Sequence, residues 1–415
     1  MTGQVLYVGD MHLPGMLHAR GLLSSEHHAR IVSIDTSRAE RLPGVRGVAT
    51  ARDLADNVTG QIVKEQPIFA DTKVRYRGEI VALVAADTEE IAHAAVELID
   101  VKYEPLPAVF DAREAMKPDA PIIHEEGQEK LCKGNRIMVF GHDCLQQIHG
   151  DVDKGFAEAD IIVEETISTS GQRSVPIEPH ACLVRPEAVG GVTVWSNTQV
   201  PFMVSGTLAQ ALGLPLNKVR VIVPAVGGGF GQKGQMTIEP NVAALALKVR
   251  RPVRWAMSMH DNMVYGSTKA PHYMTFKLGL KRDGTLTAIH RTHISNAGAY
   301  GSTACISSGK AAMIGSGTYR IPNQSAEVWT VYTNTSQSAP FRGFGMSQPS
   351  VAIETMMDIA ARRVGMDPLE FRLRNALVDG DRCGTGQVMH SVGITACLEK
   401  VKMMARWGVG TSDSR

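Results

Sequence analysis

The sequence predicts an α+β protein made of two successive modules, one over residues 1–125 and one over residues 151–405. In both modules, short apolar runs that fit buried strands alternate with capped, helix-like stretches. A polar segment at 126–150 follows a proline-rich stretch and is predicted to be a linker between domains. Residues 406–415 are predicted to form a polar tail.

The first module is predicted from an apolar run at 80–84, which fits a buried strand, and from the helix signal that follows it. Asp87 is expected to cap that helix, and Glu90 lies three residues further on, as in a capping box. The helix is expected to run through Val96, and residues 101–103 to return as a second strand. Strands and a helix within one short stretch indicate an α+β unit.

The second module continues this alternation. Strands are expected at 192–195 and 219–223, and helices at 202–212, 239–249 and 349–364. Asp367 and Pro368 are expected to start one more helix as N-cap and first helical residue. The strand at 219–223 matters most for function, because it leads directly into a glycine cluster.

Composition and charge exclude several functional classes. Lysine plus arginine total 43 against 42 for aspartate plus glutamate, so we expect no nucleic-acid partner and no anionic membrane surface. No apolar run reaches the length of a membrane span and the N-terminus lacks a signal pattern, so we expect a cytoplasmic protein. The 6 cysteines include no CxxC pair, which argues against a zinc or iron–sulfur site in this chain.

The strongest local feature is the run GGGFGQKG at 227–234, between a predicted strand and a predicted helix. Its glycines permit positive φ angles and leave successive backbone N–H groups free to bind an anionic or electron-rich cofactor. The run also contains GxGxxG from Gly229 to Gly234, but no acidic residue ends a strand about 20 positions later, as a dinucleotide-binding unit requires. From these residues alone, a structural tight turn and an NAD(P)-binding Rossmann site both stay open.

Three further stretches carry side chains suited to binding. The run PFRGFGMSQ at 340–348 combines a planar cation, Arg342, with aromatic rings that suit a flat ligand, although such a loop is more often an arginine stacked in a domain interface. Gln199, just after a predicted strand, offers a neutral amide donor. Glu178 and His180 are too few for a metal site and are interpreted as structural.

Taken in order, these segments resemble the molybdenum-binding subunit of the xanthine dehydrogenase/aldehyde oxidase family. Residues 1–125 are similar to that family's hammerhead domain, and residues 151–405 to the first of its two molybdopterin-binding domains. The matching pieces are GQVLY at 3–7, HARI at 28–31, YRG at 76–78, YEPLP at 103–107, IEPH at 177–180, TQ at 198–199, GGGFGQK at 227–233, NAGAY at 296–300 and FRGFG at 341–345.

The resemblance implies a molybdenum–molybdopterin cofactor, expected in a dinucleotide form and held without a direct bond from protein to metal. The residues implied to bind it are Gln199, Gly229, Phe230, Gly231 and Arg342. Gln199 matches the glutamine that hydrogen-bonds a ligand of molybdenum, and Arg342 the arginine beside the cofactor, so both are implied to be catalytic. Phe344 matches the aromatic residue that stacks on a ring substrate.

Two substitutions within the matching segments bear on the substrate. Purine-oxidising relatives carry a glutamate at the position of Gly234 and an arginine at that of Lys310, both of which contact the substrate. Gly234 has no side chain for such a contact, which argues against xanthine. Lys310 keeps the positive charge without the guanidinium fork and suits an acidic or carbonyl-bearing small molecule.

The family's second molybdopterin domain, with its catalytic glutamate, has no counterpart in the sequence. The resemblance therefore implies half of the molybdenum–pterin subunit of a hydroxylase, which oxidises N-heterocycles or aldehydes with water as the oxygen source. Nicotinate dehydrogenase is a relative whose subunit is split in this way. The expected partners, in a hetero-oligomer, are a second molybdopterin-domain subunit carrying the glutamate, an iron–sulfur subunit with 2Fe–2S and a flavin subunit with FAD. A truncated, non-catalytic fragment is the alternative.

Overall fold

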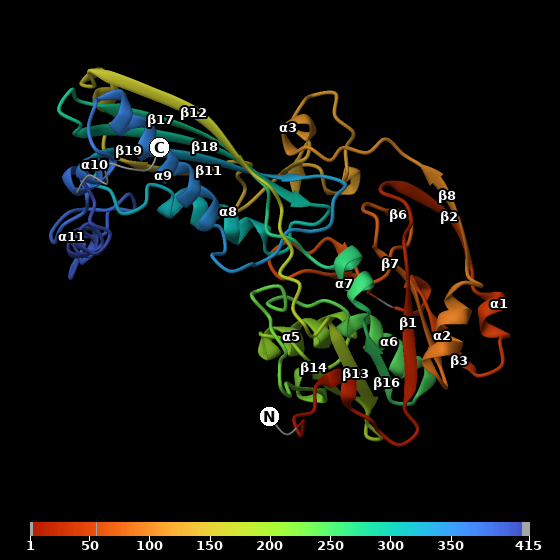
Figure 1. Cartoon of the computed structure of the whole chain (residues 1–415). Helices are drawn as coiled ribbons and strands as arrows, with labels where there is room; N and C mark the ends of the chain where they lie inside the picture. The colour runs from red at the N-terminus through yellow and green to blue at the C-terminus, as the bar shows by residue number, and fades with distance from the viewer. Residues whose placement is uncertain (1–2, 55, 409–415) are drawn as a thin grey trace, which may run out of the picture.

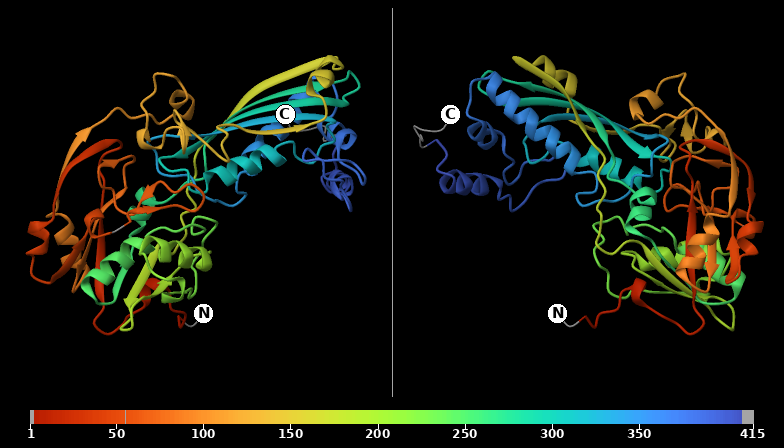
Figure 2. Two further views of the ribbon diagram at one scale, coloured as in Figure 1. Left: turned by 180° about the vertical axis from the view of Figure 1, so that it is seen from behind. Right: turned by 45° about the vertical axis from the view of Figure 1, so that its right-hand side comes forward.

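The computed structural model describes residues 3–54 and 56–408, which form two lobes that meet at an angle (Figure 1 and Figure 2). Each lobe is built on one seven-stranded sheet, and the described residues also form a three-stranded and a two-stranded sheet. Helices are combined with sheets whose strands pair mostly antiparallel, which confirms the predicted α+β class. No helix among the described residues is long and apolar enough to cross a membrane.

The sheet of the first lobe has the strand order β15-β14-β13-β16-β1-β7-β3. Its strands are β1 (Leu17–Leu23), β3 (Val45–Ala49), β7 (Ile80–Ala86), β13 (Ala181–Pro186), β14 (Val192–Ser196), β15 (Val219–Ile222) and β16 (Val253–Ala256). β1 pairs in parallel with β16, with Leu17 opposite Val253. The two modules expected from the sequence therefore contribute strands to one continuous sheet.

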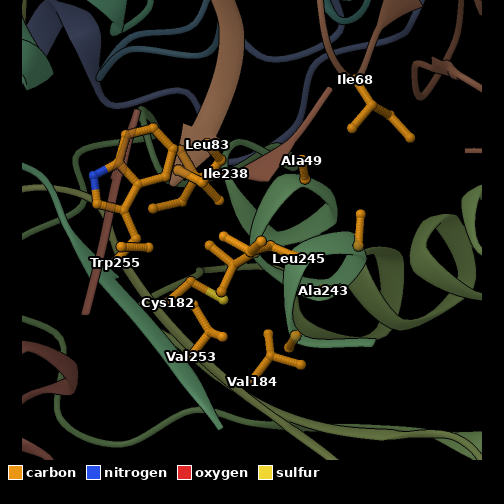
Figure 3. Packing of buried hydrophobic residues seen from close by; sticks show 14 of the residues in the cluster. Ala49, Ile68, Leu83, Cys182, Val184, Ile238, Ala243, Leu245, Val253 and Trp255 are labelled. Carbon is orange, nitrogen blue, oxygen red and sulfur yellow. The ribbon is translucent and has the colours of Figure 1, made fainter. Parts of the chain in front are cut away.

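Both modules also share a hydrophobic core between this sheet and α6 (Glu239–Val249) (Figure 3). β7 is apolar and buried along its whole length, which confirms the strand predicted at 80–84. Trp255 of β16 packs over β1, where Gly21 leaves the space: a Cβ at Gly21 would lie 2.5 Å from the indole ring. Interiors are packed densely enough that such fits hold neighbouring elements in fixed positions, so the first lobe gives its loops a rigid base.

Small sheets and short helices complete the first module. They are β2 (Ala29–Asp35), β4 (Val58–Thr59), β5 (Gln66–Pro67), β6 (Lys73–Val74), β8 (Asp100–Pro105), α1 (Ser37–Glu40), α2 (Glu89–Val96) and α3 (Ala112–Ala115). The prediction of Asp87 as the N-cap of α2 is wrong. Thr88 Oγ1 accepts from Ile91 N at 3.3 Å, whereas the Asp87 carboxylate pairs with Arg46. A charge-assisted hydrogen bond to a guanidinium is stronger than a neutral helix cap, so the Asp87 carboxylate binds Arg46 and does not cap α2.

The sheet of the second lobe carries α8 (Ala304–Ile314) and α9 (Ser347–Arg363) (Figure 1). Its strands are β9 (Cys132–Lys133), β10 (Arg136–Ile137), β11 (Leu145–His149), β12 (Ile161–Thr169), β17 (His272–Leu280), β18 (Leu286–Gly298) and β19 (Asn323–Tyr332). Residues 126–150 are not a free linker, because β10 and β11 both pair with β19. This stretch has one apolar run, at 137–140, among mostly polar residues, and its strands are short, which is why composition indicated a linker.

The remaining elements are α4 (Val152–Ala157), α5 (Pro201–Ala211), α7 (Met259–Tyr265), α10 (Pro368–Asn375), α11 (Ile394–Met404) and the 3-10 turns Val8–Asp10, Ala51–Asp53, Glu125–Gly127 and Leu216–Lys218. The predicted helices at 202–212, 239–249 and 349–364 are confirmed by α5, α6 and α9. Asp367 caps α10 as predicted, and its Oδ1 accepts from Leu369 N at 2.9 Å. Of the predicted tail, residues 409–415 lie outside the described residues.

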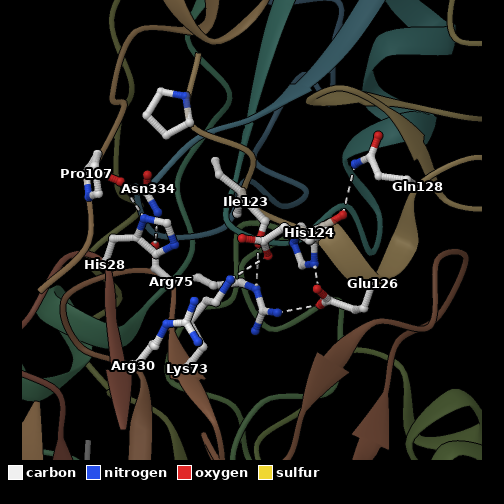
Figure 4. A network of polar contacts seen from close by, with 12 residues as sticks. His28, Arg30, Lys73, Arg75, Pro107, Ile123, His124, Glu126, Gln128 and Asn334 are labelled. Carbon is white, nitrogen blue, oxygen red and sulfur yellow. Dashed lines mark hydrogen bonds and ion pairs between the residues drawn. The ribbon is translucent and has the colours of Figure 1, made fainter. Parts of the chain in front are cut away.

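A buried polar network joins the first module to the second lobe (Figure 4). Asn334, just after β19, donates through Nδ2 to the carbonyl oxygen of Arg75 at 2.9 Å. Arg75 in turn donates through Nε to Ile123 O at 3.1 Å and pairs with Glu126. Buried polar groups that find partners on both sides of a junction rigidify it, so this network stabilises the arrangement of the two lobes.

Candidate active site

Two loops from different lobes meet where the lobes join. The glycine loop, residues 227–234, follows β15, and the arginine loop, residues 340–346, precedes α9. Arg342 N donates to Phe230 O at 2.9 Å. Gly231 also approaches closely, since a Cβ there would lie 2.8 Å from a carbonyl oxygen of the arginine loop. The structure therefore brings together the segments that the sequence assigned to one site.

Both loops hold residues in left-handed backbone conformations. Gly228 and Gly231 have φ values of 96° and 95°, which suit glycine. Phe230 has φ 54° and Phe344 has φ 35°, although both carry large side chains. Each such non-glycine residue costs about 1–2 kcal/mol, and strain of this kind concentrates at functional sites.

Gln199 lies against the glycine loop. Its backbone N–H donates to Lys233 O at 2.8 Å, and its side-chain Oε1 accepts from Gly231 N at 2.9 Å. A Cβ at Gly229 would lie 2.6 Å from the Gln199 amide, so a larger residue there would displace the Gln199 side chain. Gln199 Oε1 accepts a hydrogen bond from the loop, whereas the two N–H donors of Nε2 find no acceptor among the described residues.

A buried ion pair supports the glycine loop from beneath. The Lys233 side chain is 1% exposed, and its Nζ lies 2.9 Å from Glu178 Oε2, which also accepts from Gly227 N at 2.7 Å. Burial lowers the pKa of Lys233, and the contact with Glu178 opposes that shift. His180 is buried beside this pair, and burial lowers its pKa to about 3, so its ring is neutral. Sequence reasoning did not connect Glu178 with Lys233.

The predicted substrate residues Lys310 and Phe344 are neighbours. Lys310 Nζ, on α8, lies 4.5 Å from the centroid of the Phe344 ring, a favourable cation–π arrangement. Gly345 packs on α8 at φ 88°, and a Cβ there would lie 2.0 Å from Ser307 O. Gly234 faces its own loop instead, since a Cβ there would lie 2.8 Å from a carbonyl oxygen of the glycine loop.

Lys269 is a site residue that sequence reasoning missed. Its Nζ donates to Ser347 Oγ at 2.7 Å and lies 4.7 Å from the centroid of the Phe341 ring, and burial lowers its pKa. Lys269 is 78 positions from Ser347, so no motif spacing reveals the contact. Lys269, Lys310 and Arg342 form no ion pair with a carboxylate among the described residues, so they bring net positive charge to this region.

Exposed apolar side chains lie near both loops. They are Ile177 (93% exposed), Phe202 (91%), Phe230 (47%) and Met346 (45%). Large apolar side chains gathered at an exposed site are typical of binding surfaces. Within residues 3–54 and 56–408, no three His, Cys, Asp or Glu side chains gather to hold a metal ion.

The geometry does not support the Rossmann alternative. β15 ends at Ile222 and α6 begins at Glu239, so residues 223–238 separate strand from helix. A dinucleotide site needs its glycines at the helix N-terminus, where the helix end faces the pyrophosphate. Here the glycines instead pack against Gln199 and the arginine loop.

Two family models match the chain. The molybdopterin cofactor-binding domain matches residues 133–376, and the aldehyde oxidase and xanthine dehydrogenase a/b hammerhead domain matches residues 2–107. The large molybdopterin subunit of nicotinate dehydrogenase from Eubacterium barkeri is 35% identical, over 100% of this chain and 95% of that protein. A probable xanthine dehydrogenase subunit from Bacillus subtilis is 34% identical, over 96% of this chain but 54% of that protein.

Solved structures agree with this result. The aldehyde oxidoreductase from Desulfovibrio gigas superposes with a TM-score of 0.92 at 30% identity, over 98% of this chain and 45% of that one. Quinoline 2-oxidoreductase from Pseudomonas putida gives a TM-score of 0.89 at 30% identity, over 98% and 52%. Apart from the Eubacterium barkeri subunit, the chain spans about half the length of these relatives.

Proposed function

The chain belongs to the aldehyde oxidase and xanthine dehydrogenase family of molybdopterin-binding proteins, and from this premise we propose that it forms one half of the active site of a molybdenum hydroxylase. The contact between the glycine loop and the arginine loop is the observation that supports this proposal. There Gln199 Nε2 and the Arg342 guanidinium have no protein partner among the described residues. Neutral and cationic N–H donors of this kind suit the oxygen-rich, anionic groups of a molybdenum–pterin cofactor.

The residues present fit that cofactor. We assign its binding, in a dinucleotide form, to Gln199, Gly229, Phe230, Gly231 and Arg342. Gly231 N donates to Gln199, whereas the backbone N–H groups of Gly229 and Phe230 find no acceptor among the described residues and are available to an anionic ligand. When bound, the molybdenum centre supplies the oxidising chemistry, with water as the source of oxygen. Gln199 and Arg342 orient it and stabilise the charge that develops during the reaction.

We assign the substrate as a planar, electron-poor N-heterocycle or an aldehyde. Phe344 offers a ring face for stacking, and the Lys310 ammonium beside it binds a carboxylate or carbonyl oxygen. Lys269 and Arg342 add positive charge, so a ring that bears an anionic group is favoured. The similarity to a nicotinate dehydrogenase subunit supports this choice, and the absence of a carboxylate at Gly234 disfavours purines.

The base that takes a proton from water comes from a partner in this proposal. Neither the glycine loop nor the arginine loop contains Asp or Glu, and Glu178 is engaged by Lys233 and Gly227. We assign the base to a glutamate of the polypeptide that carries the second molybdopterin domain. Electrons then leave through an iron–sulfur subunit with 2Fe–2S and a flavin subunit with FAD, because this chain has the motifs for neither.

Turnover by the native complex tests the proposal. The complex is assayed with nicotinate, an aromatic aldehyde and xanthine in isotopically labelled water, with molybdenum measured in parallel. We expect label in the product and a preference for nicotinate over xanthine of about tenfold or more. The chain alone is the control and is expected to be inactive. Turnover by the chain alone at the rate of the complex would refute the half-site.

A further inference from the structure

The helix α11 (Ile394–Met404) differs from the other long helices of the described structure. It contains no buried residue, whereas α2, α5, α6, α8, α9 and α10 each bury at least two. Five of its apolar residues nevertheless recur at helical spacing and form one stripe, whereas Met403 lies on the opposite side. The stripe consists of Ile394, Cys397, Leu398, Val401 and Met404.

The lobe holds α11 by polar contacts and leaves most of this stripe uncovered. Lys402 pairs with Glu370 of α10, and Trp407 Nε1 donates to Asp367 Oδ2 at 2.9 Å. Val401 is 58% exposed and Met404 is 74% exposed. An amphipathic helix normally turns its whole apolar face to the core; here Ile394 and Leu398 are half-buried, while Cys397, Val401 and Met404 of the stripe remain exposed.

An isolated helix of this length is marginal in water, because helices shorter than about 12–15 residues gain most of their stability from packing. Five stripe residues on a helix about 16 Å long are also too few to form a stable interface by themselves, since specific interfaces bury about 800 Å² per partner. The stripe therefore needs a partner that also contacts the lobe elsewhere.

We infer that α11 is a docking helix, whose stripe is covered by the polypeptide corresponding to the second half of the relatives. This inference rests on the proposed function. The chain spans about half of most relatives described above, so that polypeptide is of similar size. In Figure 1 and Figure 2, α11 lies at the free end of the second lobe, on the side that faces α5. A polypeptide bound on this side of the molecule lies next to both α5 and α11.

The test uses co-expression of the chain with that polypeptide, and measures the dissociation constant by titration. Val401→Glu/Met404→Glu places charges on the stripe and is expected to weaken binding at least tenfold. Glu399→Lys, on the opposite face, is the matched control and is expected to bind like the wild type. Because Val401 and Met404 are exposed, the thermal stability of the chain alone should not change.

Alkylation of the exposed Cys397 gives a second readout. The thiol lies on the stripe, so we expect it to react in the isolated chain and to be protected in the complex. Wild-type affinity of the double variant together with an unprotected Cys397 would overturn the docking role while leaving the proposed function intact. Absence of any complex with the wild-type chain would instead remove the proposed function. If sedimentation shows that the double variant abolishes self-association of the chain, the occupant is a second copy and the inference is wrong.

Discussion

Replacing Glu178 by glutamine is expected to loosen the glycine loop by leaving a buried cation unpaired. The Lys233 side chain is 1% exposed, and its Nζ contacts Glu178 Oε2 at 2.9 Å. Removing one partner of a buried ion pair costs about 3–5 kcal/mol. The glutamine oxygen can still accept one hydrogen bond, and burial already lowers the pKa of Lys233 and so eases loss of its proton. We therefore expect about 3 kcal/mol, at the lower end of that range.

Urea unfolding of the chain measures this loss. Glu187→Gln is the control, since Glu187 forms an exposed pair with Arg185 and its loss should change stability by less than about 1 kcal/mol. A double variant that also carries Lys233→Met removes both charges and should recover most of the stability. If Glu178→Gln is as stable as Glu187→Gln, the ion pair does not support the loop and the reasoning fails.

The pH dependence of Glu178→Gln gives an independent check. Without the carboxylate, the pKa of Lys233 in the folded chain falls further below its ordinary value of 10.5. At pH values between the lowered pKa of the folded chain and the ordinary pKa, the unfolded chain binds a proton on Lys233 that the folded chain does not. The free energy of unfolding therefore rises with pH in this range. The wild type should show a smaller rise. An equal slope in both proteins would contradict the account of Lys233.

Three further outcomes are expected. Gly231→Ala, at φ 95° and close to the arginine loop, should separate the two loops and abolish molybdenum retention, whereas Gly206→Ala, in open space on α5, should retain the metal; the metal content of both variants decides this. Lys310→Met should raise KM for an anionic substrate about tenfold with little change in kcat, and leave a neutral aldehyde unaffected; equal effects on both substrates would count against its role. Burial lowers the pKa of His272 to about 4, so the unfolded chain binds the extra proton between pH 4 and 6.5 and stability falls as pH drops through that window. His272→Leu should remove up to about 3 kcal/mol of that fall, measured by unfolding at several pH values.

Local signals in the sequence predicted several elements well. The cap at Asp367 and the all-apolar run of β7 depend on neighbouring residues alone, so their patterns can be read directly. The glycine loop was also identifiable, because positive φ angles at Gly228 and Gly231 require a residue without Cβ. The error at Asp87 arose from a distant residue, Arg46, that competes for its carboxylate.

Long-range contacts limited the prediction of the site. Glu178 and Lys233 lie 55 positions apart, and their role depends on burial that no spacing reveals. Lys269 reaches Ser347 across 78 positions, and only the folded chain brings them together. Likewise, the parallel pairing of β1 with β16 joins the two modules in one sheet, so a boundary read along the sequence does not mark a break in hydrogen bonding.

The central claim is that this chain holds half of a molybdenum site. The most direct measurement is a mild pull-down of the chain from its native host, with metal analysis and mass spectrometry of the recovered proteins. We predict molybdenum together with a second molybdopterin-domain chain, an iron–sulfur chain and a flavin chain. A metal-free chain recovered alone would contradict the claim and identify a non-catalytic fragment, in which the arrangement of Gln199, Arg342 and Phe344 serves no reaction.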